Sequence, residues 1–102
     1  MVEAENKNDA VYFKFVGELD ESCALKVKNY MDDVIEYTKI KKFVMDLKKL
    51  TFMDSTGIGI LIGRYKKITK KNGVVFISAP QPVVDKVLTL SGIYQIMPKI
   101  EE

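Results

Sequence analysis

The chain has no histidine and a single cysteine, Cys23, among its 102 residues. A Ser-His-Asp triad, a Cys-His dyad and a histidine-based zinc site are therefore impossible within it. A disulfide within the chain is also excluded, which is typical of a reducing compartment. We interpret Cys23 as a small, partly buried hydrophobic residue. These absences argue against the common nucleophilic and zinc-dependent enzymes.

Long apolar runs and a strong charge of one sign are missing as well. No stretch approaches the ~20 apolar residues that span a bilayer, and the N-terminus lacks a signal-peptide core. The 16 basic and 14 acidic residues give a net charge of +2, which indicates no nucleic-acid partner. Basic residues do gather between Lys66 and Lys71, where we expect a helix to end. The sequence therefore predicts a cytoplasmic protein that acts without membrane or nucleic acid.

What the sequence does contain is enough apolar material for one core. Apolar residues make up 47% of the chain and charged residues 29%, as in a soluble globular domain. No repeat, low-complexity tract or linker divides it, so we predict a single domain over residues 1–102.

The hydrophobic pattern alternates between strand and helix periods. It predicts helices at 22–38, 55–71 and 82–91, and strands at 2–5, 11–16, 43–47, 74–77 and 94–97. The order β-β-α-β-α-β-α-β requires parallel crossovers, which are right-handed almost without exception. The predicted fold class is therefore α/β, with a mixed, mostly parallel sheet and helices.

Several residues have predicted local roles. Asp20 or Ser22 is expected to cap the first helix, and Asn72-Gly73 to end the second, with Gly73 at positive φ. Asp46 interrupts an apolar strand, which indicates hydrogen bonding to a neighbouring loop or helix end. The buried stripe of the second helix is predicted to consist of Ile58, Leu61, Ile62, Tyr65 and Ile68.

The most informative segment is residues 50–67, L-T-F-M-D-S-T-G-I-G-I-L-I-G-R-Y-K-K. It places Ser55 where a buried strand turns into a helix, directly after Asp54. Free N–H groups and the dipole at a helix N-terminus favour a phosphate there. The segment therefore indicates a phosphorylatable binding surface rather than a catalytic pocket.

Alternatives remain for the residues of this segment. Ser55 is also an ordinary N-cap residue, and Thr56 is a rival phosphate acceptor. Gly59 and Gly63 each cost about 0.5–1 kcal/mol in a helix relative to alanine, so they have either an internal packing role or a docking role. Asp20 and Asp54 do not indicate a catalytic carboxylate pair, because neither a histidine nor a Walker A loop accompanies them.

Three blocks together resemble a known family. Besides D-S-T-G within residues 50–67, they are Gly17-Glu18-Leu19-Asp20 and Leu90-Ser91-Gly92-Ile93. Along the chain the blocks follow one another as G-E-L-D, D-S-T-G and L-S-G-I, and together they resemble the STAS family over about residues 10–98. Within that family the likeness is to the bacterial anti-sigma factor antagonists, most of all those that act on the sporulation anti-sigma F factor. Family members commonly have a further C-terminal helix, and this chain departs from them by ending at Glu102.

The resemblance implies a partner-switching function without catalysis. An anti-sigma factor serine kinase, which holds ATP or ADP, would bind the unphosphorylated protein, release its sigma factor and then phosphorylate Ser55. A PP2C-type phosphatase would reverse the modification. The implied partner-binding residues are Asp20, Asp54, Thr56, Gly57, Gly59, Gly63 and Arg64. No cofactor or metal is implied for this chain itself. The alternatives are a STAS module of a general-stress or other signalling assembly and, from another class, a small nucleotide-binding enzyme.

Overall fold

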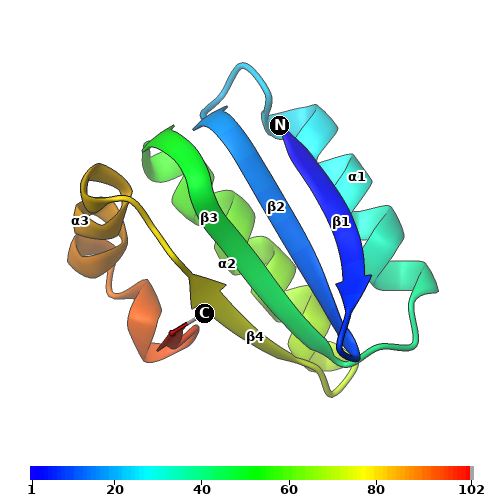
Figure 1. The fold of residues 1–102 in the computed structure, drawn as a ribbon. Helices are drawn as coiled ribbons and strands as arrows, with labels where there is room; N and C mark the ends of the chain where they lie inside the picture. Colours follow the sequence, from blue (N-terminus) through cyan, green and yellow to red (C-terminus); the bar gives the residue numbers. More distant parts are fainter. Residues whose placement is uncertain (102) are drawn as a thin grey trace.

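A five-stranded mixed sheet forms the centre of the molecule, in a computed structural model that describes residues 1–101. The strands lie side by side in chain order (Figure 1). β1 runs antiparallel to β2, and the remaining neighbours are parallel, which confirms the predicted mixed and mostly parallel sheet. The strands are β1 (Val2–Lys7), β2 (Ala10–Leu19), β3 (Lys42–Met53), β4 (Val74–Ser78) and β5 (Lys99–Ile100).

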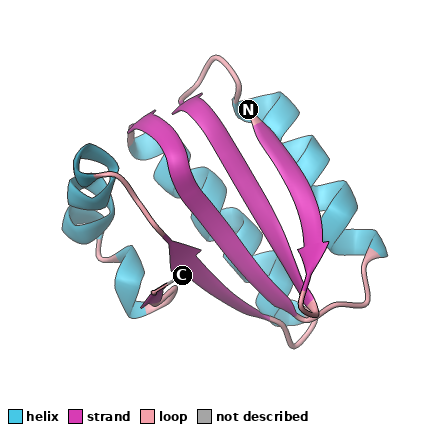
Figure 2. Ribbon diagram, viewed as in Figure 1, coloured by secondary structure: helices cyan, strands magenta, loops and turns pink. Residues whose placement is uncertain are grey.

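The helices leave one face of this sheet open. α1 (Ala24–Tyr37) and α2 (Ser55–Lys70) lie behind the sheet as drawn in Figure 2, and no helix of residues 1–101 lies in front of it. α3 (Pro82–Ser91) and the short 3-10 helix η1 (Ile93–Gln95) lie at the β4 side of the molecule. The order of elements confirms the predicted β-β-α-β-α-β-α-β arrangement.

The main core lies between the sheet and the helices. Strand alternation sends Val11, Phe13 and Phe15 of β2 into it, while Lys14 and Val16 stay exposed. The Phe13 and Phe43 rings stack with centroids 6.0 Å apart. A smaller cluster on the open face consists of Ala10, Tyr12 and Val44. Burial on one face therefore fixes the register of the central strands.

Two strands are longer than predicted, and one lies elsewhere. β3 extends to Met53 instead of residue 47, and β2 continues past Gly17, which has φ +90°. Register shifts between β2 and β3 break the period-2 pattern in these extensions. The sequence pattern therefore did not predict the full length of the two strands. The strand predicted at 94–97 is wrong: left-handed Gly92 leads into η1, and the last strand is Lys99–Ile100.

The helix boundaries and stripes also differ in detail. Neither Asp20 nor Ser22 caps α1, which begins after Cys23, and Asn72 instead of Gly73 has positive φ after α2. The buried face of α2 is rotated from the prediction. Leu61 and Ile68 are buried as expected, whereas Ile58, Ile62 and Tyr65 are only half-buried. The other buried residues of α2 are Gly57, Ile60 and Arg64.

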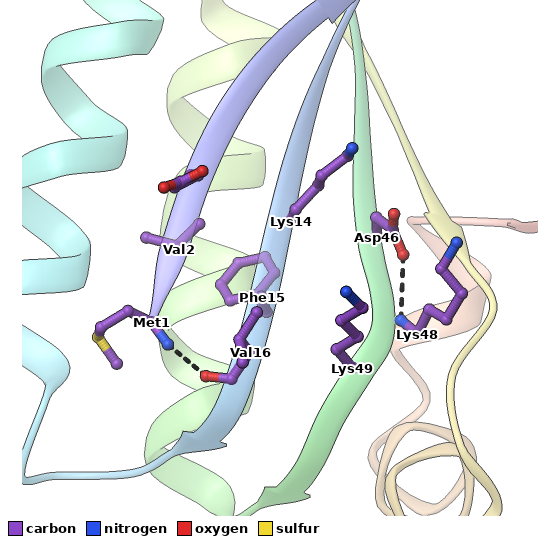
Figure 3. Close-up of a pocket in the computed structure, with 9 residues that line it drawn as sticks. Met1, Val2, Lys14, Phe15, Val16, Asp46, Lys48 and Lys49 are labelled. Carbon is purple, nitrogen blue, oxygen red and sulfur yellow. Dashed lines mark hydrogen bonds between the residues drawn. The ribbon is translucent and has the colours of Figure 1, made fainter.

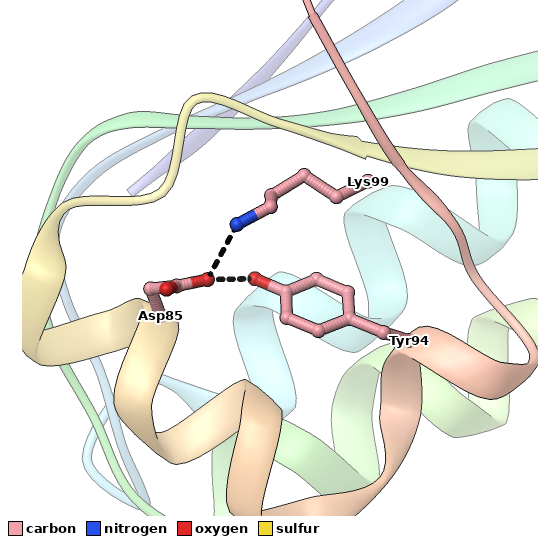
Figure 4. Close-up of polar contacts among 3 residues, drawn as sticks. All are labelled: Asp85, Tyr94 and Lys99. Atoms are coloured by element: carbon pink, nitrogen blue, oxygen red, sulfur yellow. Dashed lines mark hydrogen bonds and ion pairs between the residues drawn. The ribbon is translucent and has the colours of Figure 1, made fainter.

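Polar contacts attach the C-terminal segment to α3. The Tyr94 hydroxyl donates to the Asp85 carboxylate, and Lys99 Nζ lies 3.1 Å from the same oxygen (Figure 4). The Tyr94 hydrogen bond and then the Lys99 ammonium lower the pKa of Asp85. Burial, followed by the Asp85 contact, raises the pKa of Tyr94. Asp85 is ionised and Tyr94 protonated at neutral pH, and both shifts move the groups further from titration there, so the two contacts to Asp85 persist.

Lys71 joins the end of α2 to the end of α1. Its ammonium donates to the carbonyl oxygens of Ile35, Glu36 at 3.2 Å and Thr38 at 3.3 Å. These groups lie at the C-terminus of α1, where a cation is favourable.

We expect Lys71→Met to lower the free energy of unfolding by about 1–2 kcal/mol, because the charged donor to these carbonyls is lost. Urea unfolding measures the change. Lys70→Met is the matched control, since Lys70 is an exposed neighbour without such contacts among the described residues, and should change stability by under ~0.5 kcal/mol. Equal losses in both variants would contradict the capping role of Lys71.

Candidate functional site

Two loops meet where β2 and β3 end. Leu19 pairs with Met53 in the parallel ladder, so the residues that follow, Asp20 and Asp54, leave the same edge of the sheet side by side. Glu18 and Glu21 flank Asp20, which gives this edge a negative charge. The site predicted from two distant parts of the sequence is thus brought together by strand pairing.

Asp54, and not Ser55, caps α2. Its Oδ1 accepts the backbone N–H groups of Thr56 at 2.9 Å and Gly57 at 3.3 Å. Ser55 is the first helical residue and is exposed, and its hydroxyl makes no hydrogen bond within residues 1–101. The alternative interpretation of Ser55 as the cap is therefore wrong. Because Asp54 is the cap, the Ser55 hydroxyl takes no part in starting the helix.

Asp20 organises the neighbouring loop. Its Oδ1 accepts the Ser22 backbone N–H at 3.0 Å and the Ser22 hydroxyl at 2.6 Å. The half-buried Cys23 thiol donates weakly to the carbonyls of Glu18 and Asp20, at 3.5 and 3.4 Å. These contacts hold the loop in one shape beside the start of α2, although Asp20 caps no helix.

The three glycines of α2 have different surroundings. A Cβ on Gly57 would lie 2.6 Å from Met53 Cγ and 2.9 Å from the Leu19 carbonyl oxygen, so Gly57 allows α2 to approach the ends of β2 and β3. A Cβ on Gly59 or Gly63 would meet nothing within 4 Å. Internal packing therefore explains Gly57 and does not explain Gly59 or Gly63.

Ser55, Gly59 and Gly63 form a smooth strip along α2. Residues four apart share a helix face, so the three positions follow one another along it. Ser55 and Gly59 are exposed, and Gly63 is half-buried. We call these three residues the glycine strip. The two glycines of this strip have no side chains and let another backbone approach closely.

Gly63→Ala should raise the free energy of unfolding by about 0.4–1 kcal/mol, because the new methyl group has room and the unfolded chain loses freedom. Thermal and urea unfolding of the isolated domain measure this. A destabilised variant would contradict the open surroundings of Gly63 and restore the packing explanation.

Arg64 lies between the two long helices. Its side chain is 8% exposed, and its Nε lies 2.9 Å from Asp32 Oδ1 of α1, although the two atoms are not aligned for a hydrogen bond. Lys67 Nζ approaches the other Asp32 oxygen at 3.5 Å. Arg64, like the buried Gly57, therefore presents little surface to a partner in this structure. A partner contact by either residue stays a prediction.

Two exposed apolar side chains, which were not predicted, lie in the elements next to these loops in the chain. Phe52 at the end of β3 is 44% exposed, and Leu25 in the first turn of α1 is 68% exposed. Phe52 lies beyond the predicted end of its strand, so no sequence period indicated its direction. Exposed apolar side chains beside a polar edge are typical of protein-binding surfaces.

Within residues 1–101, no group of three histidine, cysteine, aspartate or glutamate residues could hold a metal ion. Over the same residues, no helix has the length and apolar character to cross a membrane. What the arrangement offers chemically is the Ser55 hydroxyl at the start of α2, at the head of the glycine strip.

Comparisons with known proteins identify the family. The model of the STAS domain family matches residues 1–102. An anti-sigma F factor antagonist from Paenibacillus polymyxa is 36% identical over 97 residues, which are 95% of this chain and 83% of that protein. An anti-sigma-B factor antagonist from Listeria monocytogenes is 24% identical over 91% of this chain and 81% of its own length. The chain belongs to the STAS domain family.

Solved structures agree with this assignment. The anti-sigma factor antagonist SpoIIAA in its unphosphorylated form superposes with a TM-score of 0.85 at 24% identity, covering 100% of this chain and 88% of that one. The phosphorylated form of the Bacillus cell fate determinant SpoIIAA gives a TM-score of 0.76 at 23% identity, covering 100% of this chain and 91% of that one. Identities at this level establish the shared fold, which is the one predicted from the sequence.

Proposed function

We propose that this protein is an anti-sigma factor antagonist that acts in the bacterial cytoplasm as a binding module, without catalysis of its own. Its unphosphorylated form binds an anti-sigma factor serine kinase and frees the sigma factor. Phosphorylation of Ser55 ends the interaction. The kinase supplies the nucleotide, and a PP2C-type phosphatase regenerates the active form.

The observation that carries this proposal is the position of Ser55. Its hydroxyl is exposed, without a hydrogen bond to other described residues, at the head of the glycine strip. A kinase must reach the hydroxyl, and a partner that docks on the strip would cover it. The names of the relatives, which are antagonists of anti-sigma factors, support the same function.

Charge explains how phosphorylation would end binding. A phosphate adds about −1.5 to −2 charges at pH 7. The backbone N–H groups of Thr56 and Gly57, which could otherwise donate hydrogen bonds to a phosphate, already donate to Asp54. The phosphate would therefore face the negative edge formed by Asp20 and Asp54 and point toward solvent. A partner shaped for the neutral hydroxyl would have to desolvate a dianion, which is costly.

A displacement experiment tests the proposal. The purified protein is added to a complex of the anti-sigma factor kinase and its sigma factor from the same organism, with ADP, and size-exclusion chromatography separates the species. Release of the sigma factor together with a new complex is expected. An intact original complex at excess protein would refute the proposal.

A second candidate is a STAS module of a general-stress assembly. The likeness to the Listeria anti-sigma-B factor antagonist favours it, although its 24% identity is below the 36% found for the Paenibacillus anti-sigma F factor antagonist. The same displacement experiment with an anti-sigma-B type complex distinguishes the two. Release from that complex alone would select the second candidate.

A further inference from the structure

A depression of about 480 Å³ lies on the open face of the sheet, away from the glycine strip. Figure 3 shows it between β1, β2 and β3. Its volume is within the range of about 300–1,000 Å³ typical of small-molecule sites. It is lined by Met1, Val2, Glu3, Lys14, Phe15, Val16, Asp46, Lys48 and Lys49. The proposed function makes no use of it.

A β-bulge in β3 provides two of the cations of this depression. Lys14 pairs with Asp46 and Val16 with Lys49, so β3 holds one extra residue between these pairs. The bulge leaves two successive lysines, Lys48 and Lys49, both exposed. Bulges redirect side chains and are frequent beside binding sites.

The bulge is supported by polar side chains. Asp46 Oδ1 accepts the Lys48 N–H at 3.0 Å, and Gln81 Nε2 donates to the Lys48 carbonyl at 2.9 Å. This explains why an acid interrupts the apolar run of β3. Asp46 was predicted to bond to a neighbouring loop or helix end, whereas its partner lies in its own strand. Its carboxylate is therefore engaged in holding the backbone of the bulge.

The charges and apolar surface together define a ligand class. Lys14 is paired with Glu5 at 2.6 Å, whereas Lys48 and Lys49 make no ion pair within residues 1–101. Val16, which pairs with Lys49, is 53% exposed, and Met1 on the far side of Val16 is 51% exposed; both supply apolar surface to the same depression. Glu3 and Asp46 also line it and would repel a polyanion.

We propose that this depression binds a small organic anion with a short apolar body, such as a medium-chain carboxylate. Lys48 and Lys49 hold the charged group, and Val16 and Met1 contact the apolar part. The site is independent of Ser55 and of the proposed partner switch.

An NMR titration of the 15N-labelled protein with sodium octanoate tests this. Saturable shifts of the Val16, Lys48 and Lys49 amide signals are expected. The double variant Lys48→Gln, Lys49→Gln should raise the Kd at least fivefold, and the single variant Lys49→Gln at least twofold. The control Lys66→Gln, Lys70→Gln makes the same change of net charge on exposed positions of α2 and should keep the Kd within twofold.

Two further ligands separate the parts of the claim. Octanol, which has the apolar body without the charge, should bind at least fivefold more weakly than octanoate, and so should inorganic phosphate. Equal binding of octanol, an equal loss in the control variant, or shifts that leave these three amides unaffected would each overturn the proposal. The dispersion of the spectra confirms that each variant is folded.

Discussion

Ser55→Asp is expected to weaken binding to the anti-sigma factor kinase at least tenfold, or about 1.4 kcal/mol. The added carboxylate lies at the head of the glycine strip, next to Asp54, where a docked partner would have to desolvate it. The fold should be unaffected, because position 55 is exposed and Asp54 already caps the helix. Isothermal titration calorimetry measures the affinity, and urea unfolding the stability.

Ser55→Ala is the matched control for this experiment. It should bind as tightly as the wild type and resist release by the kinase. Because Asp54 and not Ser55 accepts the Thr56 and Gly57 N–H groups, its free energy of unfolding should change by less than ~0.5 kcal/mol. An aspartate variant that binds like the wild type would contradict the charge mechanism, and an unfolded one would contradict the exposed position of Ser55.

Gly57→Ala should lower the free energy of unfolding by about 1–3 kcal/mol. The new methyl group would lie 2.9 Å from the Leu19 carbonyl oxygen, a backbone atom that cannot move without shifting the end of β2. Gly59→Ala makes the same substitution two residues away, where nothing lies within 4 Å, and should stabilise the domain. Chemical unfolding of the two variants side by side decides the matter. Similar changes in both would show that α2 does not approach the strand ends this closely.

The sequence predicted the fold where apolar periods were regular. Val11, Phe13 and Phe15 alternate with exposed or open-face residues, and the predicted strand was found there. In β3 the successive lysines Lys48 and Lys49 ended the predicted strand at residue 47. The ladder nevertheless continues through the bulge to Met53. Pairing with a neighbouring strand, which a single segment does not encode, overrides the local pattern at such positions.

The site was predicted in part, and for a physical reason. D-S-T-G contains three side chains in succession that can cap a helix, and local sequence does not determine which of them does so. The strand ending at Met53 sets Asp54 in extended backbone, so Asp54 becomes the cap and Ser55 is left free. The roles of the glycines likewise depend on which face of α2 meets the sheet, and the rotation that buries Arg64 was not evident from composition.

The most direct test of the proposed switch is the location of the phosphate. The protein is incubated with its anti-sigma factor kinase and ATP, and tandem mass spectrometry of proteolytic fragments identifies the modified residue. One phosphate per chain, on Ser55, is the predicted result, because this hydroxyl is exposed whereas Thr56 is half-buried in the first turn of α2. A phosphate on Thr56 or on another residue, or an unmodified protein in a stable complex with an active kinase, would contradict it.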